Sequence, residues 1–101
     1  MSMQKKITEA IRALVEKEGF ELLVNYNYAN TGTMQVQPKG EFKTIMNFGF
    51  HFNPGYVVFT FNSDPAPFGR VERFGYVAYN DDKRIKDFLG YVGERVKGTK
   101  S

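Results

Sequence analysis

The chain has 101 residues, of which 42% are hydrophobic and 16% aromatic, and this length suits one domain with a single core. It has no cysteine, which excludes disulfides and thiolate chemistry, and no apolar run that could span a membrane, so we expect a cytoplasmic protein. The net charge of +3 permits contact with nucleic acid or with an acidic protein without requiring either.

The first predicted element is an amphipathic helix over residues 3–18. Its apolar stripe follows the spacing i, i+4, i+7, i+8 and consists of Ile7, Ile11, Leu14 and Val15. Charged side chains of both signs take the other side, which favours a helix packed on a sheet over a membrane-surface helix. Gly19 is well placed to end the helix.

Two predicted turns then connect three strands. The first strand runs from Phe20 to Ala29, and one of its faces carries Leu22, Val24, Tyr26 and Tyr28. Asn30-Thr31-Gly32 predicts a three-residue loop with Gly32 in the left-handed conformation. This loop would pair Tyr28 with Met34 and Tyr26 with Val36. Pro38-Lys39-Gly40 predicts the second turn, which would pair Val36 with Phe42 and Met34 with Thr44.

Residues 42–62 carry the strongest hairpin signal. The alternating face of the first strand holds Phe42, Thr44, Met46, Phe48, Phe50 and Phe52. Asn53-Pro54-Gly55-Tyr56 predicts a type II turn, with Gly55 at positive φ. On the aromatic face this turn pairs Phe52 with Val57, Phe50 with Phe59 and Phe48 with Phe61. On the opposite face it pairs His51 with Val58, Gly49 with Thr60 and Asn47 with Asn62. A one-residue slip would mix the two sets.

A longer connection, Ser63–Glu72, contains two prolines and a glycine and is predicted to be irregular. Phe68 and Arg70 near its tip are candidate contacts. The alternative is that Phe68 only covers the edge of the core. A fifth strand is predicted from Arg73 to Tyr79. Its apolar side would carry Phe74, Tyr76 and Ala78.

The closing element is predicted to be a helix capped by Asn80 or Asp81, with Asp82 in its first turn, where the helix dipole favours a carboxylate. The buried stripe of this helix would consist of Ile85, Phe88, Leu89, Val92 and Val96. Residues 98–101 are expected to fray.

These elements predict an α+β fold, with residues 1–101 in a single domain. We expect a five-stranded antiparallel meander sheet with the N- and C-terminal helices packed on one face, in the order α-β-β-β-β-β-α. The other face would be open. It would present Leu23, Asn25, Asn27, Lys43, Ile45, Asn47, His51, Tyr56, Val58, Thr60, Asn62, Arg73, Val77 and Tyr79. An open antiparallel face is normally polar, whereas this one is half apolar and rich in amides and rings. Such a surface suits a partner protein or a homodimer, or it is an ordinary exposed sheet with β-branched residues.

Catalysis is not predicted. His51 is the single histidine and lacks neighbours at metal-ligand spacing, and no nucleophile elbow, phosphate loop or dinucleotide fingerprint occurs. We therefore expect neither a cofactor nor a metal.

The sequence favours a small non-catalytic binding module, an accessory protein or inhibitor of the phage, plasmid or immunity type that occludes a partner's surface. The candidate partner-binding residues are Asn25, Asn27, Lys43, Asn47, His51, Tyr56, Val58, Arg73, Val77, Tyr79, Phe68 and Arg70. The alternative is a nucleic-acid-binding protein that uses aromatic and basic residues of the sheet, with Tyr56, Tyr79, Lys43 and Arg73 as its platform.

Overall fold

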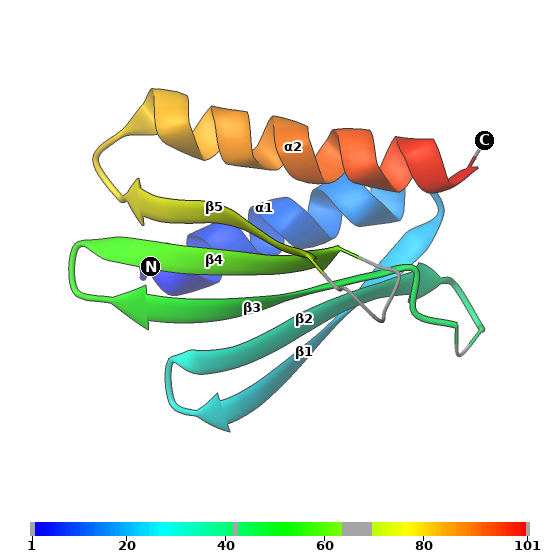
Figure 1. The fold of residues 1–101 in the computed structure, drawn as a ribbon, viewed down its shortest axis with the longest axis horizontal. Helices are drawn as coiled ribbons and strands as arrows, with labels where there is room; N and C mark the ends of the chain where they lie inside the picture. The colour runs from blue at the N-terminus through cyan, green and yellow to red at the C-terminus, as the bar shows by residue number, and fades with distance from the viewer. Residues whose placement is uncertain (1, 42, 64–69, 101) are drawn as a thin grey trace.

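Two helices and five antiparallel strands follow one another in the predicted order (Figure 1). The computed structural model describes residues 2–41, 43–63 and 70–100, with the side chains of 61–63, 70–74 and 99–100 left out. The elements are α1 (Met3–Lys17), β1 (Phe20–Tyr28), β2 (Thr31–Pro38), β3 (Met46–Asn53), β4 (Tyr56–Ser63), β5 (Arg70–Ala78) and α2 (Asp82–Lys100). The strands lie in the sheet in chain order, so the predicted α+β meander is confirmed.

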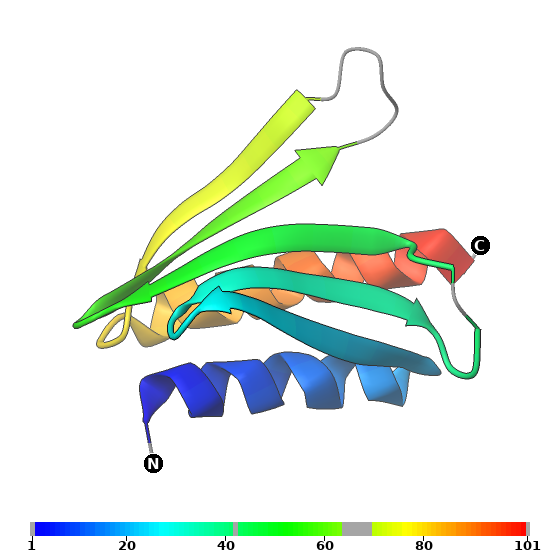
Figure 2. The same cartoon turned by 90° about the horizontal axis from the view of Figure 1, so that it is seen from below.

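Both helices pack on the same side of the sheet (Figure 2). Helix α1 contacts β1, α2 contacts β5, and the helices contact each other. Between them and the sheet lies a core that includes Ile11, Phe48, Phe59, Phe88 and Val92. The ring of Phe88 from α2 stacks on that of Phe59 from β4, with centroids 3.9 Å apart. The apolar stripes of both helices therefore face the aromatic side of the sheet, as their periodicity predicts.

Three residues mark the helix ends, of which Gly19 and Asp81 were predicted from the sequence. The hydroxyl oxygen of Ser2 accepts a hydrogen bond from the backbone N–H of Lys5, at 3.2 Å, and caps α1. Gly19 follows the end of α1 at φ +89°, as expected for a stop signal. A carboxylate oxygen of Asp81 accepts from the N–H of Arg84 at 3.0 Å and caps α2.

The β3–β4 hairpin has the predicted register. Its pairs include Phe48 with Phe61, Phe50 with Phe59, Phe52 with Val57 and His51 with Val58. Gly55 adopts φ +90°, the positive value that the second central position of a type II turn requires. Because the aromatic set and the turn residues specify the same alignment, this hairpin was predictable from sequence.

The β1–β2 register differs from the prediction by four residues, because the centre of the turn lies two residues earlier than expected. Val24, rather than Tyr28, pairs with Met34, and Tyr26 pairs with Gly32, so the chain reverses at Ala29-Asn30. Gly32 has no positive φ. Its role is close packing, because a Cβ atom there would lie 2.0 Å from the backbone oxygen of Asn25. A four-residue shift preserves the alternation, so Leu22, Val24 and Tyr26 keep their predicted face. Tyr28 does not, because the irregularity between Tyr26 and Tyr28 moves it to the opposite face, where it pairs with Thr31.

The β2–β3 connection is also longer than predicted. Val36 pairs with Met46 and not with Phe42, and β3 starts at Met46. Lys43 is thus exposed in the connection and is not part of the sheet face, which corrects its predicted position. Ile45, expected on the open face, packs partly buried against the core.

In the fifth strand, residues 76–78 face the opposite way to the prediction. The strand starts at Arg70, three residues earlier than expected, and its register shifts beside Phe59 and Thr60, which pair with Gly75 and Arg73. Phe74 is therefore an extra residue, and Gly75 next to it has φ +88°. This β-bulge breaks the simple alternation. As a result Val77 pairs with Val57 in the core and is 1% exposed, whereas Tyr76 points outward.

Candidate protein-binding face

The side of the sheet that faces away from the helices carries a row of residues that crosses all five strands. We call it the outer row: its members pair in the order Tyr28, Thr31, His51, Val58, Tyr76. Tyr28 is 77% exposed and Tyr76 is 58% exposed, and His51 is exposed between them. The row therefore offers an aromatic ring at each end, with β-branched and imidazole side chains in the middle.

Two tyrosines stack at the β5 end of the outer row. The ring of Tyr56 lies 4.5 Å from that of Tyr76, with an angle of 25° between the planes. Tyr56 comes from the first position of β4, opposite Ala78, and it is half-buried. We call Tyr56 and Tyr76 the tyrosine pair. Because each ring restricts the rotation of the other, the pair is a preorganised aromatic surface.

Helix α2 supports β5, the strand that carries Tyr76 of this pair. The guanidinium Nε of Arg84 donates to the backbone oxygen of Tyr76 at 3.4 Å. The backbone N–H of Tyr79 donates to the oxygen of Gly55 at 3.0 Å, next to the β3–β4 turn. The end of β5 is thereby attached both to the first turn of α2 and to the turn before β4.

Next to the outer row lies a row of short and polar residues. Asn25, Thr33, Gly49 and Thr60 pair in that order across β1 to β4. Among the outer-face positions whose side chains the structure describes, none is lysine or arginine. Glu21 is an acid on this face, and its carboxylate accepts a hydrogen bond from the amide of Gln37 at 2.8 Å. Most basic residues lie on the helices, so the part of this face whose side chains the structure describes is close to neutral.

Five predicted contact residues lie where the sequence placed them. Asn25, Asn47 and His51 are exposed on the outer face, and Tyr56 and Val58 are half-buried there. Asn27 is exposed at the β1 irregularity between Tyr26 and Tyr28.

The other predicted contact residues lie elsewhere or are not described at side-chain level. Lys43 lies outside the sheet and Val77 is in the core. Arg73 pairs with Thr60 and Arg70 pairs with Ser63 at backbone level, so Arg70 belongs to β5 and not to the loop. Phe68 lies outside the described residues.

Tyr79 is the second correction on β5. It was predicted on the open face, but it shares the side of Val77 and packs partly buried against the core. Burial raises the pKa of its phenol above the ordinary value of 10.0, and a hydrogen bond with the backbone of Asn53 opposes the rise. Tyr79 therefore cannot belong to an exposed aromatic platform.

The sequence reasoning missed Tyr28 and Tyr76, which were both predicted on the covered face. The irregularity after Tyr26 moves Tyr28 outward, and the bulge beside Gly75 moves Tyr76 outward. For Tyr76 a signal was present, because a lone glycine inside a strand pattern, here Gly75, often marks a bulge. Counting the alternation backward from Val77, instead of forward from Phe74, would have placed Tyr76 outside.

No protein-family model, curated protein sequence or solved structure matches this chain. Among the residues that the structure describes, no three His, Cys, Asp or Glu side chains gather closely enough to hold a metal ion. Neither helix, over its described part, combines the length and apolar content needed to cross a bilayer. Function has to be inferred from the outer face and from the pockets of the chain itself.

Proposed function

We propose that this protein is a non-catalytic binding module whose outer sheet face contacts a partner protein. The observation that carries the proposal is the tyrosine pair, a stacked and partly exposed aromatic surface at the end of the outer row. Tyrosine is enriched in protein interfaces, and lysine and glutamate are depleted in their centres. The described part of the outer face has this composition.

Preorganisation makes the tyrosine pair a suitable centre for an interface. Binding normally costs about 0.5–1.5 kcal/mol for each rotamer-rich side chain that becomes fixed. Tyr56 and Tyr76 already restrict each other in the free protein. Amides at Asn25 and Asn47 can supply hydrogen bonds around such a centre without the desolvation cost of a charge.

The biological role that we propose is that of an accessory protein or inhibitor, of the phage, plasmid or immunity type, that occludes its partner's surface. The absence of cysteine suits a reducing compartment, and we propose the cytoplasm as the site of action. A homodimer through the same face would use the same residues.

Nucleic acid is the second candidate, because exposed rings on a sheet can stack on the bases of a single strand. Such binding also needs cations to neutralise phosphates, and its affinity falls steeply with salt. The described outer face supplies no lysine or arginine. We therefore expect only weak binding to random single strands near physiological salt, as measured by fluorescence anisotropy with a random RNA oligonucleotide.

The proposal is tested by replacing Tyr56 and Tyr76 together by serine. We expect the free energy of unfolding to fall by about 1–2 kcal/mol, because a stacked aromatic pair contributes about 0.5–1.5 kcal/mol beyond its buried area. The variant should stay folded, because both rings have solvent on one side. Nuclease-treated extract of the host cell would be passed over the immobilised wild type and the variant, and bound proteins would be quantified. One or few proteins should bind to the wild type and not to the double variant.

The matched control is Tyr26→Ser, because Tyr26 is 50% exposed but lies on the helix side of the sheet. The control should retain the partner. Equal capture by the folded double variant would exclude the outer face as the interface. Tight binding of the random oligonucleotide near physiological salt would favour the nucleic-acid alternative, and a concentration-dependent sedimentation coefficient that the double variant loses would identify a homodimer.

A further inference from the structure

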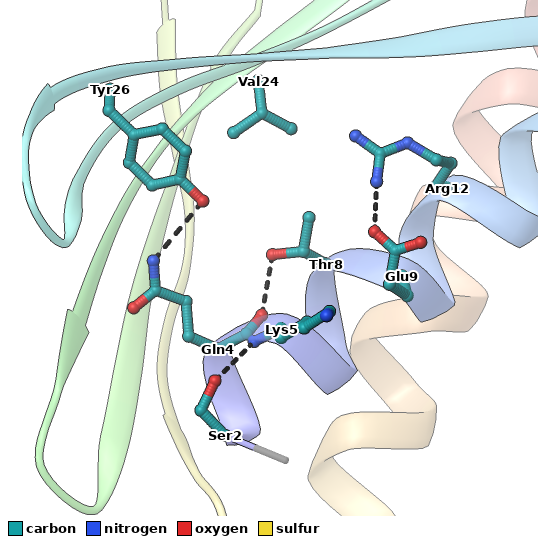
Figure 3. A pocket seen from close by; sticks show the side chains of 8 residues that line it. All are labelled: Ser2, Gln4, Lys5, Thr8, Glu9, Arg12, Val24 and Tyr26. Carbon is teal, nitrogen blue, oxygen red and sulfur yellow. Dashed lines mark hydrogen bonds and ion pairs between the residues drawn. The ribbon is translucent and has the colours of Figure 1, made fainter.

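A pocket of about 600 Å³ opens between α1 and the free edge of the sheet. Figure 3 shows the side chains that line it: Ser2, Gln4, Lys5, Thr8, Glu9 and Arg12 from or next to α1, and Val24 and Tyr26 from β1. The amide of Gln4 donates to the phenol of Tyr26 at 3.4 Å and closes one end. The other flank of α1, at Leu14, meets Gly93 of α2. The pocket therefore lies on the side of α1 that α2 leaves uncovered.

The rim of this pocket is an edge strand with free backbone groups. Among the strands that the structure describes, β1 pairs with β2 alone. In an antiparallel ladder, successive residues of an edge strand point their N–H and C=O groups alternately toward the neighbour and away from it. The backbone oxygen of Gly19 accepts from Lys39, and that of Asn25 lies against Gly32 of β2, so the odd-numbered residues face β2. Leu22 and Val24 consequently present their N–H and C=O groups at the open edge.

This edge lacks the usual protection against pairing. Edge strands are normally blunted by lysine, proline or a bulge in their middle. β1 contains neither lysine nor proline over nine residues, and its irregularity lies at its end, between Tyr26 and Tyr28. The other edge strand, β5, has Arg70, Glu72 and Arg73 in its sequence and a bulge at Phe74. β1 is therefore the edge at which a further strand can add.

We propose that this groove binds an extended, acidic peptide segment, which pairs with β1 as a sixth strand and places alternate side chains into the pocket. Main-chain hydrogen bonds to Leu22 and Val24 would supply affinity, and the pocket would supply selectivity. Alternate side chains of a strand point to the same face, so those opposite Val24 would enter beside Thr8 and α1.

Charge determines the chemistry of the peptide. The pocket contains two cations, Lys5 and Arg12, and one anion, Glu9. Arg12 forms an ion pair with Glu9, whereas Lys5 has no ion pair with any described residue. A carboxylate on an inward-facing peptide side chain would pair with the ammonium group of Lys5.

A second copy of this chain fits the groove less well. Antiparallel pairing of β1 with itself would bring together two α1 flanks, each with a net positive charge from Lys5, Glu9 and Arg12. Like charges placed against each other oppose association. The occupant is thus expected to be a different, acidic chain.

The inference is independent of the outer face and is tested with a displayed library of random nine-residue peptides. Enriched peptides should combine β-branched residues with at least one acidic residue. The charge reversal Lys5→Glu should weaken their binding by about tenfold or more. The matched control Lys6→Glu makes the same charge change on the flank that lines a different pocket with Asp82, and it should bind as the wild type does.

Amide hydrogen exchange provides the structural readout. In the free protein the N–H groups of Leu22 and Val24 should exchange fast, while those of Leu23 and Asn25, which face β2, exchange slowly. A bound peptide should slow exchange at Leu22 and Val24. Val24→Pro removes an outward N–H without breaking a β1–β2 bond and should abolish binding, whereas Val24→Thr, which keeps the N–H, should bind. Melting temperatures identify any variant that fails to fold.

Three results would overturn the inference. They are no enrichment from the library, enriched peptides that bind Lys5→Glu as well as the wild type, and no slowing at Leu22 and Val24 on binding. A fourth result concerns the free protein. If exchange at these two amides becomes slower as the protein concentration rises, the edge pairs with a second copy of the chain, and the inference is overturned. The double variant of Tyr56 and Tyr76 should keep peptide binding, so failure of either proposal leaves the other testable.

Discussion

Replacing Gly32 by alanine should strongly destabilise the β1–β2 hairpin. The added Cβ atom would lie 2.0 Å from the backbone oxygen of Asn25 and 2.9 Å from the Cα of Tyr26. An ordinary contact begins at 3.4 Å, so the strands would have to separate by at least 1.4 Å, the difference between 3.4 and 2.0 Å. Both close atoms are backbone, so no side-chain rotation relieves the clash. Overpacking costs about 1–3 kcal/mol and each lost hydrogen bond about 0.5–1.5 kcal/mol, which gives a loss of about 2–4 kcal/mol.

The matched control is Gly49→Ala on the next strand. Gly49 has no positive φ, and the nearest atom to its added Cβ would be 3.8 Å away. Its free energy of unfolding should stay within about 1 kcal/mol of the wild type. Urea titrations, extrapolated linearly to water, measure both variants. Equal stability of the two variants would refute the close approach of β1 and β2 at Gly32.

Three further predictions concern the core, α2 and the alkaline limit of stability. Phe50→Ala should lower the free energy of unfolding by about 3–5 kcal/mol, because the ring is 3% exposed and contacts Tyr26 and Phe52. Gly90→Ala should raise it by about 0.5–1 kcal/mol, because Gly90 is exposed within α2 and nothing lies within 4 Å of the added Cβ. Tyr79→Phe should reduce the loss of stability at alkaline pH. The folded state raises the pKa of Tyr79, so its contribution is complete below 10.0, the ordinary value, and declines as the pH rises through the raised one.

Chemical denaturation checks all three, with the third repeated across an alkaline pH series. A Phe50→Ala variant as stable as the wild type would place this ring outside the core. A destabilised Gly90→Ala would mean that position 90 does not sit in an exposed helix interior. Identical alkaline unfolding of the wild type and Tyr79→Phe would show that the phenol of Tyr79 is not buried.

The residue pattern alone was sufficient to determine the type and order of the elements. Period 3.6 in the helices and period 2 in residues 42–62 report local geometry, which a single strand or helix already contains. Pro54 and Gly55 added a turn of fixed position, and the β3–β4 register followed from both. The helix signals at Gly19 and Asp81 are equally local.

Tertiary structure decided what local patterns leave open. A register shift of four residues preserves the alternation, so the pattern of Leu22, Val24 and Tyr26 could not separate the predicted β1–β2 pairing from the observed one. The facing of β5 depended on a bulge, whose position is set by the pairing of Val77 with Val57 of β4. For that reason the stacking of Tyr56 on Tyr76 could not be predicted without the pairing of β4 with β5.

The pocket between α1 and the free edge of β1 is the feature that depends most on tertiary structure. Lys5 and Val24 lie on different elements, and nothing in the spacing of either element indicates that they line one cavity. The pocket exists because α2 covers only one flank of α1 and because β1 happens to be an edge of the sheet. Both conditions are relations between whole elements. Helical and strand periodicity specify which face of each element is buried. They do not specify which part of that face the neighbouring elements leave uncovered.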